Sequence, residues 1–177
     1  MKLRLAPLCA LILISAAIGT ITIPATLRAA TDTSAPKVKL DTSLMGPRAI
    51  EDITHKNIIR DYGLAWQTMA RALAENQRDL LENGYLVGFA KERLTQALED
   101  QVKIGVRVSY SHGVHNLQGI FYSPDGSAME LRDTAQVHIQ VLDGNRVVHN
   151  EQATLRFIVL MTPGADRWQV RYLQAVP

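Results

Sequence analysis

The chain of 177 residues contains a single cysteine, Cys9, which falls inside an uncharged run from Leu5 to Leu27. The rest of the chain therefore can form no internal disulfide, and it offers no thiol for catalysis or metal binding. Leu8 stands directly before Cys9, where a lipid-modified cysteine would follow a small residue. The sequence thus excludes disulfide scaffolds, thiol enzymes and a lipoprotein anchor.

Recognisable catalytic and metal-binding motifs are also missing. The sequence has no Ser-His-Asp order, no glycine-rich phosphate loop, no HExxH and no paired CxxC. His112 and His115 come nearest to a metal pair, but residues three apart in a strand point to opposite faces, and no third ligand lies nearby. We therefore expect structural or surface histidines there, and neither a metal nor a cofactor.

The charge balance argues against nucleic acid as a partner. The formal net charge is +2, but residues 1–30 carry Lys2, Arg4 and Arg28 and no acid. Removing those three from the 19 basic residues leaves 16 against 17 acidic residues. A nearly neutral domain has no electrostatic footprint for a phosphate backbone.

The N-terminal segment, residues 1–30, has the pattern of an export signal. Lys2 and Arg4 precede the apolar run, and small residues follow it. A helix over the 23 residues of that run would reach about 34 Å, enough to cross a bilayer core of about 30 Å. Cleavage as a signal peptide and retention as an inner-membrane anchor both stay open. Either way, the rest of the chain is predicted to be periplasmic or extracellular.

Residues 31–48 are polar, contain two prolines and a glycine, and show no sustained period, so they predict a flexible tether. Residues 49–177 are then expected to form one α+β domain. Helical spacing first marks a helix around Ile58 to Leu73, and then, after a break at 76–84, a second helix over about 85–103. In the second helix an apolar face is expected from these residues: Phe89, Leu94, Ala97, Leu98 and Val102.

From Val106 onward the period changes to two, which is typical of antiparallel strands. In the stretch 129–141 the odd positions are apolar except for Asp133, and the even positions are polar. A hairpin loop at 143–145 is expected to place Val141 opposite Val147. With a first strand after Val106 and a last one over 167–176, we predict a bent, four-stranded antiparallel meander packed against the helices.

This order of elements resembles the nuclear-transport-factor-2-like, or cystatin-like cone, superfamily, over residues 50–177 and ending in a strand such as 166–170. The resemblance implies a cone fold whose pocket lies between the helices and the concave sheet face. Members include isomerases, dehydratases, small-molecule binders and assembly domains, among them exported domains with an N-terminal anchor. It therefore implies a fold without selecting one function.

The isomerase-like members of that superfamily place a tyrosine on the first helix and carboxylates on the sheet, so the resemblance suggests Tyr62 and Asp133. The chain departs from that pattern because no acid lies between Asp100 and Asp125. His149, with Glu151, is the other candidate acid–base group, unless the hairpin tip is solvated. Side chains expected to line a ligand pocket, or simply the core, are these: Tyr62, Trp66, Asp133 and Phe157.

The polar face of the sheet carries amides and few paired charges, which suits hydrogen-bonded contact with a partner or a second copy as well as with water. We expect an exported, non-enzymatic protein-interaction domain at the cell envelope, whose partner is another protein or a second copy bound through the sheet. The alternatives are a small apolar ligand-binding protein that uses the cone, and an isomerase- or dehydratase-like enzyme that uses Asp133. A buried Asp133 within hydrogen-bond reach of Tyr62 or His149 would favour the enzyme.

Overall fold

The computed structural model describes residues 34–177. The predicted export segment, residues 1–30, lies outside them. No helix of the described part is both long and apolar enough to cross a bilayer.

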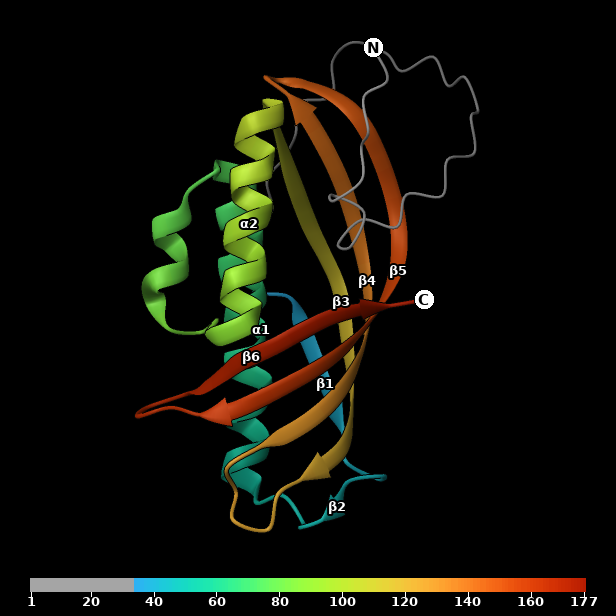
Figure 1. The fold of residues 1–177 in the computed structure, drawn as a ribbon. Coiled ribbons are helices and arrows are strands. Elements are labelled where there is room, and N and C mark those ends of the chain that lie inside the picture. Colours follow the sequence, from blue (N-terminus) through green and yellow to red (C-terminus); the bar gives the residue numbers. More distant parts are fainter. Residues whose placement is uncertain (1–33) are drawn as a thin grey trace.

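Helices α1 and α2 pack on one face of the sheet, and a short 3₁₀ segment lies against the helices on their outer side (Figure 1). Helix α1 spans Asp52–Glu75 and ends at Asn76, which adopts the left-handed conformation (φ 51°) and donates its backbone N–H to Ala72. The 3₁₀ segment η2, Arg78–Asn83, fills the predicted break, and α2 spans Gly88–Ile104. Gly105 ends α2 with a φ of 81°, as its position in the sequence predicts.

Within residues 34–177 the sheet has six strands, and the predicted count of four is wrong. Strands β3 (Val106–Tyr122), β4 (Met129–Asp143), β5 (Arg146–Pro163) and β6 (Trp168–Val176) form the predicted antiparallel meander. Two short strands, β1 (Lys37–Asp41) and β2 (Gly46–Pro47), pair parallel with β3. They come from the stretch that we expected to be a flexible tether, because its alternating Val38 and Leu40 pack partly against the core.

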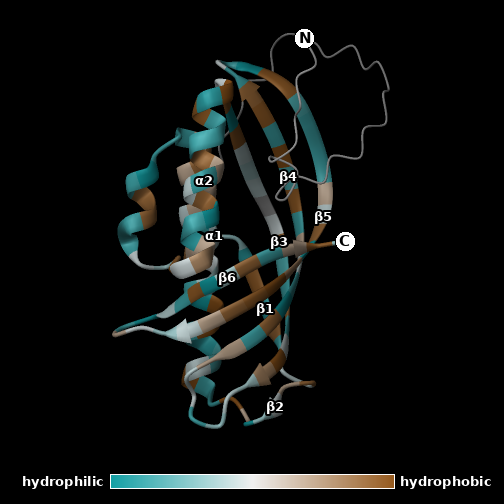
Figure 2. Cartoon of the chain, in the orientation of Figure 1, coloured by the Kyte–Doolittle hydropathy of each residue, from teal (hydrophilic) through white to brown (hydrophobic). Residues whose placement is uncertain are grey.

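The β4–β5 register differs from the expected one by two residues. Val141 lies opposite His149 rather than Val147, because an irregularity between Val141 and Leu142 shifts the pairing next to the hairpin. The shift is even, so the apolar face of β5 stays on the same side of the sheet as that of β4. Figure 2 shows the resulting alternation of hydrophobic and hydrophilic residues along both strands.

The core lies between α1, α2 and the apolar face of the sheet. In α2, Leu94 and Leu98 are buried as predicted, but Phe89 is 42% exposed and Val102 is 61% exposed, so the predicted apolar face is partly wrong. Gln101 takes the buried position instead, because its amide donates to the Leu73 carbonyl at 3.1 Å and so joins α2 to the end of α1.

Candidate functional site

A buried polar cluster joins the first helix to the centre of the sheet. Tyr62 on α1 donates its hydroxyl to the Asp133 carboxylate on β4 at 2.8 Å. His115 on β3 approaches the same oxygen with its Nδ1 at 2.7 Å. Tyr62 and His115 are 0% exposed and Asp133 is 1% exposed. The structure thus brings together the two residues that the superfamily resemblance suggested, and it adds a histidine.

An irregularity in β3 explains why sequence reasoning missed His115. Before it, the even residues Val108 and Tyr110 face the core; after it, the odd residues His115 and Leu117 do. The pairing with β4 shifts between His112 and His115, so the alternation changes phase there. Gly113 lies in the irregular stretch and was the one indication in the sequence of an irregular strand there. It did not show which histidine would face the core.

Burial and charge both affect the Tyr62 hydroxyl. Removal from water disfavours its anion, and the neighbouring Asp133 carboxylate disfavours it further, so the pKa of Tyr62 lies well above its ordinary value. Asp133 accepts through one oxygen, while its other oxygen, Oδ1, is buried with no hydrogen-bond partner among the described residues. At neutral pH, Tyr62 is therefore a hydrogen-bond donor and not a base.

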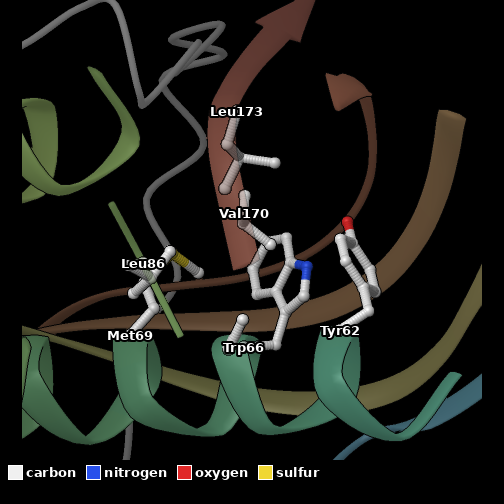
Figure 3. A pocket seen from close by; sticks show the side chains of 7 residues that line it. Tyr62, Trp66, Met69, Leu86, Val170 and Leu173 are labelled. Carbon is white, nitrogen blue, oxygen red and sulfur yellow. The ribbon is translucent and has the colours of Figure 1, made fainter. Parts of the chain in front are cut away.

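Aromatic side chains close the space around this cluster. The Trp66 ring lies 4.5 Å from the His115 ring and 5.3 Å from the Phe157 ring, measured between centroids. Figure 3 shows its indole reaching from α1 towards Val170 on β6, beside the Tyr62 ring. The gap lined by these side chains has about 170 Å³ between its atoms but admits no water molecule. It is lined by Tyr62, Ala65, Trp66, Met69, Leu86, Val170 and Leu173.

The predicted pocket residues therefore divide into two groups. Tyr62 and Trp66 line the gap. Phe157 and Asp133 do not line it: Phe157 contacts the Trp66 ring, and Asp133 accepts the hydrogen bond of Tyr62. Because typical ligand pockets hold roughly 300–1,000 Å³, this gap is too small for a drug-sized molecule.

His149, the second catalytic candidate, does not join the cluster. Its Nε2 lies 3.2 Å from Glu151 on the same strand, and the two side chains are 33% and 36% exposed. The other interpretation, a solvated hairpin tip, describes this pair better than an acid–base pair inside a pocket. Within residues 34–177, no three His, Cys, Asp or Glu side chains gather as metal ligands would.

A second buried carboxylate, Asp61, had no signal in the sequence beyond its place next to Tyr62. It is 1% exposed, and its two oxygens accept from the Trp168 backbone N–H at 2.8 Å and from Arg60 at 2.7 Å. Asp61 therefore fixes the start of β6 on α1, and β6 supplies Val170 and Leu173 to the gap beside Trp66. The carboxylate is fully engaged in holding the fold.

Comparison with known proteins gives a fold and no sequence relative. No family model matches the chain, and no curated protein sequence matches it. Among solved structures, the intermembrane-space region of the chloroplast protein ARC6 superposes with a TM-score of 0.57 at 15% identity, over 73% of this chain and 98% of that one. The chain therefore shares the fold of that region.

Other structural neighbours have lower TM-scores and are described as NTF2-like or cystatin-like. A Streptomyces avermitilis protein assigned to the NTF2-like family as a dehydratase has a TM-score of 0.45 at 10% identity, over 69% of this chain and 97% of that one. A cystatin-like-fold protein of unknown function from Nostoc punctiforme has a TM-score of 0.40 at 15% identity, over 72% and 93%. At such identities the likeness is one of fold, so function has to be argued from the site.

Proposed function

We propose that the chain is an exported, non-enzymatic domain that binds a protein at the cell envelope. The observation that carries the proposal is the complete burial of the cluster and the closure of the gap beside it. A general acid or base must come within about 3 Å of the group that it protonates or deprotonates. Tyr62, His115 and Asp133 are at most 1% exposed, and the gap beside them admits no water.

The cluster is well suited to a structural role. Tyr62 on the helix, His115 on β3 and Asp133 on β4 form one hydrogen-bonded contact across three elements. Such a buried contact fixes how the helix sits on the sheet, since any other arrangement would leave a carboxylate without partners in an apolar surrounding. The export leader and the likeness to an intermembrane-space region support an envelope location.

A second candidate function is a carrier or enzyme for a small apolar molecule. It is favoured by Asp133, whose Oδ1 is buried without a hydrogen-bond partner among the described residues, next to a tyrosine and a histidine. This combination can donate and accept protons once a ligand is admitted. Admission requires Trp66 or the half-buried Leu173 to move, because both line the gap.

Photo-crosslinking of the full chain in cells that export it separates these functions. A photoreactive residue is placed at Gln152 on the sheet, with Glu92 on α2 as the matched control, since both side chains are exposed. Native mass spectrometry of the purified chain is run in parallel. We expect protein adducts from position 152, none from position 92, and no bound small molecule. A bound small molecule without protein adducts would overturn the proposal.

A further inference from the structure

Strand β5 has a long edge that no described strand covers. It pairs with β4 from Arg146 to Met161, but β6 pairs with it only from Arg156 onward. Ten residues, 146–155, thus lie at the border of the sheet over about 34 Å. Figure 1 shows this upper part of β5 beyond the end of β6. Every second backbone N–H and C=O along it points away from β4.

The usual protections of such an edge are weak here. Residues 146–155 contain no proline, lysine or glycine, and the pairing with β4 is regular from His149 to Leu155. One inward-facing acid, Glu151, would discourage pairing, but His149 lies 3.2 Å from it on the same face. Apolar side chains on that face are only half-buried and could lose more water on pairing: Val147, Ala153 and Leu155.

We propose that this edge pairs antiparallel with the same edge of a second copy of the chain. The inference rests on the proposed binding function and names its partner. A two-fold axis normal to the sheet keeps the apolar faces of the two copies on the same side. Residues that face each other across the new pair must then point to the same side of the sheet. The axis therefore lies beside one residue and its own copy, and not between two successive residues. The two axes nearest the middle of the free stretch pass through Asn150 or Glu151.

Charge complementarity selects the axis at Asn150. It places His149 of each copy opposite Glu151 of the other, whereas an axis at Glu151 would place the two carboxylates directly opposite each other. Opposite charges on facing residues favour strand pairing and like charges oppose it. The observed His149–Glu151 contact within one strand is then repeated across the pair, because each imidazole can donate a ring N–H to the carboxylate of the other copy.

The length of the free edge also fits this register. With the axis at Asn150, Arg146 lies opposite Thr154 of the second copy. The central pairs, residues 149 to 151, fall in the regular part of β5, and Val148, at the irregularity, lies opposite Gln152. Leu155 then stays unpaired on this side of β5, and the next residue, Arg156, pairs with Val176 of β6. The pairing therefore fits between the hairpin at 143–146 and the end of β6 without displacing either.

Disulfide crosslinking of the full exported chain, with Cys9→Ser to leave a single thiol, tests the register. Asn150→Cys would face its own copy with Cα atoms about 4.5–5.5 Å apart, within reach of a disulfide. Gln152→Cys is the matched control, since it would lie four residues from its copy, about 14 Å along the strand. We expect covalent dimers with Asn150→Cys and monomers with Gln152→Cys. Equal crosslinking of the two, or none with Asn150→Cys, would overturn the register.

Sedimentation equilibrium tests the charge argument independently. His149→Glu places carboxylates opposite each other in both pairs, and we expect the association constant to fall about tenfold. Mixing that variant with a His149→Lys, Glu151→Lys variant should restore association as a heterodimer. An association constant unchanged by His149→Glu would overturn the proposal.

The outcomes distinguish this inference from the function on which it rests. Adducts from position 152 to a different protein, with no crosslinked dimer, would overturn the second copy as partner and leave the binding function standing. A bound small molecule with neither adducts nor dimers would overturn both.

Discussion

Tyr62 and Asp133, 71 residues apart in the chain, share a 2.8 Å hydrogen bond in a part of the core that water does not reach. The bond places a helix hydroxyl against the one charged residue on an otherwise apolar strand face. With His115 on the other side, it is the main polar contact between α1 and the middle of the sheet.

Loss of the Tyr62 hydroxyl is expected to lower stability more than loss of an exposed one. Tyr62→Phe should reduce the free energy of unfolding by about 1–3 kcal/mol, since it takes a donor from a buried carboxylate. Tyr172→Phe, on a half-exposed side chain, should change it by less than about 0.5 kcal/mol. Urea unfolding measures both, and equal effects would mean that the buried bond is not stabilising.

The contributions of Tyr62 and Asp133 to stability should also be coupled. In a double-mutant cycle, Asp133→Asn and Tyr62→Phe are expected to cost less together than the sum of the single changes, because both remove the same bond. The non-additivity should be about 0.5–3 kcal/mol in unfolding free energy. Additive effects would show that the two side chains act separately.

Alkaline pH should destabilise the fold through two buried tyrosines. Burial raises the pKa of Tyr110 to about 12 and, with the Asp133 charge, raises the pKa of Tyr62 further above its ordinary value. The neutral form is favoured in the folded chain, so this stability is complete below about pH 10 and is lost as pH rises through the folded-state pKa values.

Each of the two tyrosines should contribute about 1.4 kcal/mol per pH unit to that loss above pH 10. Unfolding measured at pH 9, 10 and 11 should therefore show a smaller slope for Tyr110→Phe than for the natural chain. An unchanged slope would mean that Tyr110 ionises equally in both states.

Trp66 is expected to keep the cone closed. Trp66→Ala should cost about 3–5 kcal/mol in unfolding free energy and leave an apolar cavity. Such cavities bind xenon or benzene, so benzene should raise the melting temperature of this variant and not that of the natural chain. Phe89→Ala, at a 42% exposed ring, serves as the control and should gain no benzene binding. Stabilisation of the natural chain by benzene would favour the ligand-binding function instead.

Asp61 offers a matched pair of changes at the β6 junction. Asp61→Asn keeps an oxygen for the Trp168 N–H but turns its amide N–H₂ toward the Arg60 guanidinium, which can only donate. Because the Arg60 side chain is 54% exposed and can turn to water, a cost of about 1 kcal/mol is expected. Asp61→Leu leaves that N–H without an acceptor and should cost about 1–3 kcal/mol. Hydrogen exchange at the Trp168 amide should accelerate only in the second variant.

Local patterns in the sequence predicted much of this fold and less of the site. Asp133 stood out because it interrupts a strict alternation, and Gly105 marked the end of α2. His115 could not be placed, because its orientation depends on an irregularity in β3 that shifts the alternation by one residue. Strand β1 was missed because its alternation covers only five residues, and its parallel partner in β3 lies about 77 residues further along the chain.

The order β1-β3-β4-β5-β6 also has a mechanical consequence. A pull on the chain ahead of Lys37 would reach β1 first, which is held to β3 by five paired residues. That border of the sheet lies across β3 and β4 from the free edge of β5. Because Val38 of β1 pairs with His115, tension on the leading segment would pass through these five pairs to the part of β3 that holds His115 against Asp133.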